Sequence, residues 1–165
     1  MSDDLLIKEE DIIIRNYRTS DYQATLNILL ELQSKFNIGF VESKWRETSG
    51  LRQFKPNLKR ITLIAELKST GQVVSLGMLE AVKNNLGQYI GYLNNWATGK
   101  EFIGKGVGKI LADRATQILK SWGCEAVRIN MAYGGDKQLQ KLIEVFGKTG
   151  FKPVIIVLEK KFENE

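Results

Sequence analysis

A glycine-rich run, Ile103-Gly-Lys-Gly-Val-Gly108, carries the clearest chemical signal in the sequence. It follows a predicted strand and opens a predicted helix. Glycine lets a backbone approach a ligand closely, and the free N–H groups of a helix's first turn attract anions. Lys105 and Lys109 add positive charge. The run therefore predicts a phosphate-binding loop, although a plain strand-to-helix turn would also favour glycine.

Two other phosphate-binding motifs fit this region poorly. The stretch Gly99-Lys-Glu-Phe-Ile-Gly104-Lys105 begins like a P-loop, but Gly106 follows where Ser or Thr must bind Mg²⁺. A dinucleotide-binding fingerprint needs GxGxxG early in a βαβ unit with an acid about 20 residues later. This chain instead has GxGxG after consecutive predicted strands. Both an NTPase and a dinucleotide-dependent enzyme are disfavoured.

The residue types that are missing exclude a wide range of chemistry. The chain has no histidine and one cysteine, Cys124. A Ser-His-Asp triad, a Cys-His pair, an imidazole base and a cysteine-cluster metal site are therefore excluded. We expect no metal, and proton transfer must use carboxylates, Tyr, Lys, the thiol or water. Cys124 lies at a predicted strand start, which is typical of a small core residue rather than a nucleophile.

The predicted elements place the glycine-rich loop at the centre of an α+β sheet protein. Hydrophobic patterning predicts strands over residues 11–17, 61–68, 73–82, 88–98, 125–132 and 152–160. Helices are predicted after Ser20, where Ser20 and Gln23 suggest a capping box, after the glycine-rich loop, and from Asp136. Segment 37–60 is expected to hold a short helix. With 165 residues, 43% of them hydrophobic, the chain suits one core, so 1–165 is expected to be a single domain.

Three segments together match the motifs of one known family. The first is a (Gln/Arg)-x-x-Gly-x-(Gly/Ala) motif, which resembles Ile103-Gly-Lys-Gly106-Val-Gly108. The second is a Tyr-x-x-x-Gly-Phe segment, which resembles Phe146-Gly-Lys-Thr-Gly-Phe151. The third is an opening strand and helix start, which resembles Ile12-Ile-Ile-Arg-Asn-Tyr-Arg-Thr-Ser-Asp21. With the element order, they resemble the GNAT superfamily of acetyl-CoA-dependent N-acetyltransferases. The resemblance implies the acyl-CoA N-acyltransferase (GNAT) fold, an α+β (α/β three-layer) arrangement whose central, mostly antiparallel, splayed mixed sheet is flanked by helices.

The resemblance also implies acetyl-CoA as the co-substrate. Backbone N–H groups of the loop would hold its pyrophosphate. Main-chain groups of the preceding strand would pair with its pantetheine arm, where that strand splays from the one at 125–132. The implied binding residues are Trp96, Ala97, Thr98, Ile103, Gly104, Lys105, Gly106, Val107, Gly108 and Lys109. Ile103 replaces the family's Gln or Arg, which acts mostly through its backbone, so CoA binding is expected to survive.

The implied reaction is direct attack of a primary amine on the thioester, which needs a base and often an acid for the thiolate. Phe146 stands where many relatives have the Tyr that protonates the thiolate. Tyr133 is the candidate substitute acid and Glu80, on a central strand, is the candidate base. Their plainer interpretations are a half-buried strand-end tyrosine and a solvated glutamate. Tyr92 and Asn94 alternate on one strand face and are candidates to line the acceptor site.

Residues 41–60 hold six basic and two acidic side chains, a net charge of +4. By the resemblance, this segment falls where the family binds its acceptor. An acidic protein segment or an RNA-linked amine is one interpretation, and a solvated surface is the other. Two other functions stay open: a GNAT-fold module that binds CoA without turnover, and a nucleic-acid-associated regulatory module.

The remaining expectations concern the cellular setting. The N-terminal residues are acidic where a secretory signal would be basic, and no stretch approaches the ~20 apolar residues of a membrane span. We expect a cytoplasmic protein with no membrane contact, either a monomer or a homodimer. The acceptor is expected to be an amine on a small molecule or a protein, and the sequence does not choose between them.

Overall fold

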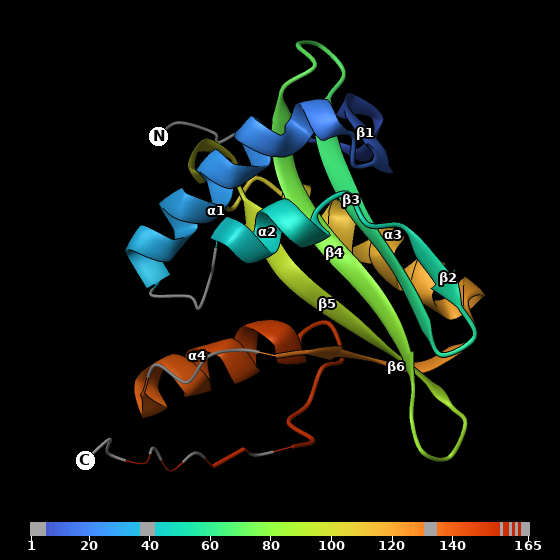
Figure 1. Cartoon of the computed structure of the whole chain (residues 1–165). Helices are drawn as coiled ribbons and strands as arrows, with labels where there is room; N and C mark the ends of the chain where they lie inside the picture. Colours follow the sequence, from blue (N-terminus) through green and yellow to red (C-terminus); the bar gives the residue numbers. More distant parts are fainter. Residues whose placement is uncertain are drawn as a thin grey trace. The chain divides into compact units, whose positions relative to one another are not determined.

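A computed structural model describes residues 6–36, 42–130 and 135–155, together with residues 157, 158, 160 and 162. For Lys35, Phe36 and Gln138 it describes the backbone alone. The chain divides into two compact units, residues 1–130 and 131–165, and the first unit holds the sheet (Figure 1). The single domain expected from the sequence therefore stays a prediction.

The elements of the first unit follow the order expected from the hydrophobic pattern. They are η1 (Glu9–Asp11), β1 (Ile12–Asn16), η2 (Thr19–Asp21), α1 (Tyr22–Phe36), α2 (Glu42–Thr48), β2 (Gln53–Lys55), β3 (Leu58–Leu67), β4 (Val73–Lys83), β5 (Tyr89–Thr98), η3 (Lys100–Phe102), α3 (Val107–Ser121) and β6 (Cys124–Ile129). Strand β2 was not predicted, because its three residues are too few to show an alternating pattern.

The second unit contains α4 (Asp136–Gly147), which begins at the predicted residue. The strand predicted over 152–160 is wrong for the residues that the structure describes there, since none of them is in a strand. Val157 and Leu158 are 83% and 92% exposed. A run of apolar residues makes a strand only when a neighbour supplies the hydrogen-bond ladder and covers the apolar side chains.

Within the described residues the sheet has six strands in the order β1-β3-β4-β5-β6, and β2 forms a hairpin with β3. All the pairs are antiparallel except β5–β6, which is parallel. This confirms the mostly antiparallel mixed sheet. The parallel pairing ends at Leu93 and Ile129, so the last residues of β5 extend beyond β6.

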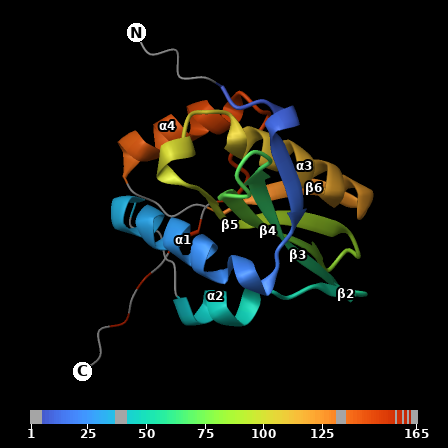
Figure 2. The same cartoon turned by 90° about the horizontal axis from the view of Figure 1, so that it is seen from above.

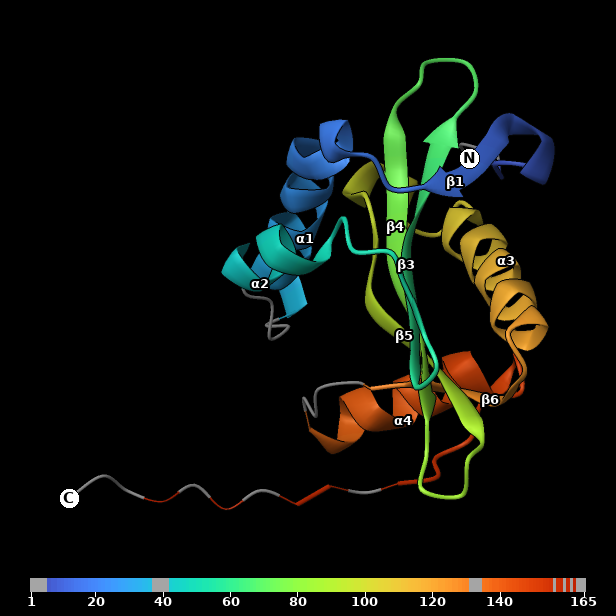
Figure 3. The ribbon, with the colours of Figure 1, turned by 45° about the vertical axis from the view of Figure 1, so that its right-hand side comes forward.

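Helices cover both faces of the sheet, so the strands bury side chains on both sides. Helices α1 and α2 lie on one face and α3 lies on the other, as Figures 2 and 3 show from different directions. The α3 face is packed around Leu63, Leu79 and Leu111, whereas the α1 face is packed around Leu29 and Trp45. No described helix is both long and apolar enough to cross a membrane.

A β-bulge in β5 sets which side chains reach each face. Leu76 pairs with Ala97 while Met78 pairs with Asn94, so β5 carries one extra residue opposite Gly77. Asn95 has a φ of 49°, and the extra residue directs Trp96 toward the α3 face, where its ring covers Gly77.

An ion cluster fixes the junction between β1 and α1. Arg15 donates to both carboxylate oxygens of Asp21, at 2.7 and 2.8 Å, and to Glu66 at 2.8 Å. Asp21 also accepts the Arg18 backbone N–H. Asp21 therefore caps η2, the short turn that leads into α1. The predicted capping pair does not form, since the Gln23 side chain donates to Asn27 instead.

We predict that Gly77→Ala destabilises the protein by about 1–3 kcal/mol, because an added Cβ would lie 2.1 Å from the Trp96 ring. Gly50→Ala is the control, since its Cβ would be at an ordinary 3.7 Å from Tyr17. Urea unfolding of both variants measures the difference. Equal stability of the two variants would contradict the packing of Trp96 on Gly77.

We predict a pH-dependent loss of stability for Asp21→Asn. Burial acts to raise the pKa of Asp21, but the hydrogen bonds from Arg15 and Arg18 outweigh it and hold the pKa below its usual 3.8. Ionised Asp21 therefore stabilises the fold above that pH, and this contribution disappears as the pH falls through the lowered pKa. The variant should lose about 1.5–3 kcal/mol at pH 7 and less near pH 3, as measured by urea unfolding at each pH. A loss independent of pH would contradict the ionic role.

Candidate donor site and acceptor face

The glycine-rich loop makes two left-handed turns immediately before α3. Gly104 has a φ of +81° and Gly106, the residue that caps α3, has a φ of +91°. Residues with a Cβ rarely adopt these angles. Backbone conformation requires glycine at these two positions, as a plain strand-to-helix turn would, since apart from chain neighbours no atom of the described residues lies closer than 3.6 Å to either added Cβ. The phosphate-binding role of the loop stays a prediction.

The first turn of α3 presents backbone donors. The Ile110 N–H is the first to bond within the helix, to the Gly106 carbonyl. The N–H groups of Val107, Gly108 and Lys109 precede it and lie at the positive end of the helix dipole. On the other side of the loop, the Ile7 N–H donates to the Lys105 carbonyl at 2.9 Å. The Lys105 N–H donates to the Phe102 carbonyl at 3.2 Å. The loop is therefore held in place, while the N–H groups of the first turn of α3 stay available for an anion.

The lysines of the loop differ in their surroundings. Lys109 Nζ lies 2.6 Å from Asp113 on the next turn of α3, and both side chains are exposed. Lys105 Nζ lies 5.9 Å from the centre of the Phe102 ring. Neither lysine is buried, so both can turn toward a polyanion at little cost.

The end of β5 has a free outer edge beside this loop. Trp96, Ala97 and Thr98 lie beyond the last β5–β6 pair, and β4 pairs with Ala97 and Thr98 along their inner edge. Ser75 Oγ donates to the Ala97 carbonyl and lies 2.9 Å from Thr98 Oγ1. Their outer edge has no strand partner in the described part of the chain, so extended polar groups of a ligand can pair with it.

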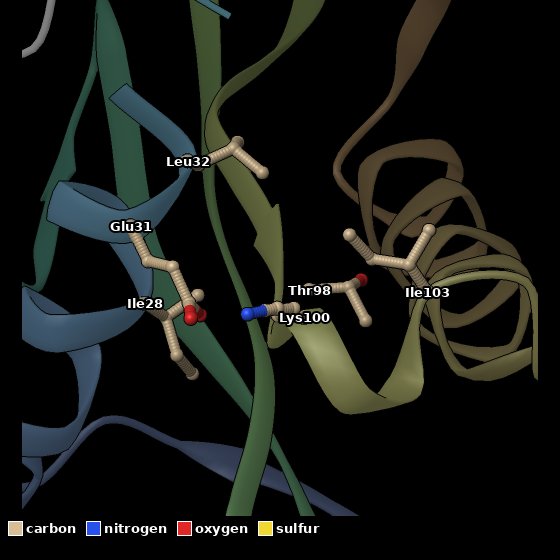
Figure 4. A pocket seen from close by; sticks show the side chains of 6 residues that line it. All are labelled: Ile28, Glu31, Leu32, Thr98, Lys100 and Ile103. Carbon is tan, nitrogen blue, oxygen red and sulfur yellow. The ribbon is translucent and has the colours of Figure 1, made fainter. Parts of the chain in front are cut away.

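A shallow hollow lies between α1 and the loop. Its lining, shown in Figure 4, consists of Ile28, Glu31, Leu32, Thr98, Lys100 and Ile103. Glu31 and Lys100 extend into it from opposite sides. Ile103, which replaces the family's polar residue, keeps 49% of its surface exposed. The predicted loop residues and the β5 residues are thus brought to one end of the sheet.

Glu80 is held in a polar network on the sheet face that carries α1. Arg60 Nε donates to its Oε1 at 2.6 Å, and Asn94 Nδ2 donates to its Oε2 at 3.1 Å. The Glu80 side chain is 16% exposed, so the interpretation as a solvated glutamate is wrong. Tyr92 is its direct cross-strand neighbour. Tyr92 and Asn94 lie on the same face of β5, as the alternation in the sequence predicts.

Arg60 is the residue that sequence reasoning missed here. It had been counted only with the basic residues of segment 41–60. Those residues do not form one patch: Lys59 and Arg60 point to opposite faces of β3, and Arg46 pairs with Glu42 on α2. The pairing of Arg60 with Glu80 was hidden because it depends on the register between β3 and β4.

The second candidate for proton transfer, Tyr133, lies outside the described residues. Phe146 is on α4 and packs edge-on against Phe151, with ring centres 5.9 Å apart. Burial raises the pKa of the Cys124 thiol, which Lys59 lowers to a lesser extent, so this thiol is a poor nucleophile. No described group of three or more Cys, Asp or Glu side chains is arranged to hold a metal ion.

Comparisons with known proteins agree with this architecture. The model of the acetyltransferase (GNAT) family matches residues 26–151. No curated protein matches the chain. Glucosamine-6-phosphate N-acetyltransferase from Arabidopsis thaliana is 18% identical, with a TM-score of 0.67 over 92% of this chain and 99% of that one.

Two further solved structures are similarly related. A GNAT family acetyltransferase from Staphylococcus aureus is 16% identical, with a TM-score of 0.63 over 92% of this chain and 99% of that one. An aminoglycoside acetyltransferase from an uncultured soil metagenomic sample, in complex with sisomicin, is 13% identical, with a TM-score of 0.65 over 94% and 99%. These likenesses show the GNAT fold, and with the family match over most of its length the chain belongs to the acetyltransferase (GNAT) family.

Proposed function

We propose that this protein transfers an acetyl group from acetyl-CoA to a primary amine. The proposal rests on one observation. The left-handed residues Gly104 and Gly106 place the first turn of α3 beside the edge of β5 that has no strand partner among the described residues. A pyrophosphate needs clustered N–H donors and an extended amide chain needs a strand edge. Both are adjacent in one continuous stretch of chain.

The donor is held mainly by backbone groups. The backbone N–H groups of Gly104, Gly106 and the first turn of α3 bind the pyrophosphate of CoA, because the Lys105 N–H already donates to the Phe102 carbonyl. The side chains of Lys105 and Lys109 add charge. The outer edge of Trp96, Ala97 and Thr98 pairs with the amides of its pantetheine arm. Because backbone groups do this work, the replacement of a polar residue by Ile103 is tolerated.

Bound acetyl-CoA supplies a thioester carbonyl that is open to attack by a neutral amine. A new N–C bond replaces the C–S bond, and the amine loses one proton while the thiolate gains one. Glu80 accepts the amine proton, directly or through water, since Oε2 has a lone pair beyond the one that Asn94 uses. Tyr133 is the proposed proton donor to the thiolate.

Several features of this proposal rest on the sequence and the family. The whole chain acts as one domain in the cytoplasm, without a metal, as a monomer or a homodimer. The acceptor is an amine on a small molecule or a protein. The alternative is a GNAT-fold module that binds CoA without turnover, which the missing hydroxyl at Phe146 favours. Acetyl transfer to any amine distinguishes the two.

We predict that Gly106→Glu weakens acetyl-CoA binding at least tenfold, because the side chain brings negative charge to the anion site and strains a left-handed turn. Gly87→Glu is the matched control: Gly87 has a φ of +80° in the β4–β5 turn, also in open space. Calorimetric titration with acetyl-CoA, with CoA and ATP for comparison, measures the effect. Unchanged binding to Gly106→Glu, or an equal loss in both variants, would refute the assigned site.

We predict that Glu80→Gln lowers kcat/KM for amine acetylation about 100-fold or more, while acetyl-CoA binding stays unchanged, because the variant cannot accept the amine proton. Glu66→Gln is the control, since Glu66 is also a half-buried sheet carboxylate paired with an arginine. Release of the CoA thiol with a panel of amines reports the rate. An equal loss in both variants would indicate a structural role for Glu80 instead.

A further inference from the structure

One row of polar side chains crosses the sheet on the face that carries α1 and α2. Each residue is the direct cross-strand partner of the next, and the row consists of Gln53, Arg60, Glu80, Tyr92 and Arg128. Their neighbours along the strands, including Ile61, Leu79, Leu93 and Val127, pack into the core on the opposite, α3 face. Alternation along each strand therefore places the whole row on one face.

The face changes character from one row to the next. Ile64, Leu76 and Ala97 form a buried apolar row beneath α1. The following row is mixed, with Thr62, Met78 and Asn94. Thr62 Oγ1 is buried there without a hydrogen-bond partner among the described residues, as is Gln53 Oε1 on the polar row itself. A further apolar row of Leu58, Val82, Ile90 and Ala126 follows on the other side. The polar row therefore lies between apolar rows of the same face and has hydrogen-bonding capacity to spare.

The two arginines of this row differ in their partners. Arg60 is neutralised by Glu80. Arg128 is half-buried, and within the described part of the chain it has no acidic group at ion-pair distance and no hydrogen-bond acceptor. A guanidinium that is partly removed from water without a counter-charge is costly. Its planar fork matches a carboxylate or a phosphate.

The spacing of the row relates this cation to Glu80. Arg128 and Glu80 are two strands apart, with Tyr92 between them, so their Cα atoms are separated by about 10 Å. Both side chains rise from the same face of the sheet, on either side of Tyr92. A small molecule with an ammonium group at Glu80 and an anionic group a few ångströms away would contact both.

We propose that Arg128 binds an anionic group, a carboxylate or a phosphate, on the amine acceptor, and so selects acceptors that carry both charges. This inference rests on the proposed function, which places the amine at Glu80. Tyr92 lies between the two charged groups and lines the acceptor's path. Acceptors with positive charge at both ends, such as polyamines, are disfavoured because one end would meet Arg128.

The test measures binding in matched pairs that differ in one charge. The probes are 4-aminobutyrate with 4-aminobutanamide, and O-phosphoethanolamine with ethanolamine. Each is titrated by calorimetry into protein saturated with CoA, so that no acetyl transfer takes place. The proteins are wild type, Arg128→Gln, Arg128→Lys and, as a control at an exposed position on α3, Arg114→Gln.

For at least one pair, we expect the anionic probe to bind wild type at least tenfold more tightly than its neutral partner. Arg128→Gln should reduce this ratio to near one, Arg128→Lys should keep part of it, and Arg114→Gln should leave it unchanged. If only the 4-aminobutyrate pair shows this preference, the site binds a carboxylate. If only the O-phosphoethanolamine pair shows it, the site binds a phosphate. The proposal is overturned if wild type binds the anionic and the neutral probe equally, or if Arg128→Gln keeps the wild-type preference for the anionic probe. The absence of binding by every probe also overturns it.

Release of the CoA thiol with acetyl-CoA and the same four amines separates this inference from the proposed function. A charge preference that depends on Arg128, without acetyl transfer to any amine, supports the anion subsite and counts against the transferase. Acetyl transfer without that preference supports the transferase and overturns the subsite.

Discussion

The hydrogen bonding of β5 is the constraint on which the rest of the site depends. This strand pairs with β4 along nearly its whole length, but with β6 only as far as Leu93. Backbone polar groups need partners, so the half of β5 beyond Leu93 has one edge that a ligand can satisfy. After β5 the chain passes through the single turn η3 to the left-handed residues Gly104 and Gly106. The strand edge and the donors of α3 are therefore adjacent through the covalent chain itself.

The bulge at Asn95 makes this arrangement compatible with a buried sheet. The extra residue reverses the alternation of β5, so that Trp96 covers Gly77 on the α3 face and Ala97 reaches the α1 face. Without the bulge, Trp96 would point toward the small space beneath α1. Packing on both faces thus fixes the register of β5 and, through it, the direction in which the strand's last backbone groups point.

In the proposed reaction, different parts of this fold recognise the donor and the acceptor. The proposed donor site consists mostly of backbone N–H groups and a strand edge, which the GNAT architecture supplies whatever the side chains are. The proposed acceptor face consists of side chains, and there Glu80 accepts hydrogen bonds from Arg60 and Asn94. Membership of the family therefore determines the donor chemistry much better than the identity of the amine, because function resides in the groups placed on a fold.

The sequence alone determined the features that depend on local patterns. Helical periodicity located α3 and α4, alternation located β3, β4 and β5, and the glycines marked the turn before α3. The missing histidine excluded whole classes of catalyst. Patterning failed where an element depends on its neighbours, as with the short strand β2 and the strand expected over 152–160.

Only the tertiary structure decided which side chains meet. Arg60 and Glu80 are twenty residues apart, and Arg128 joins their row through a parallel pair. Such meetings depend on strand register, which a single bulge shifts by one residue. Register is set by packing on both faces of the sheet and by hydrogen bonds between distant segments, and no local pattern contains that information.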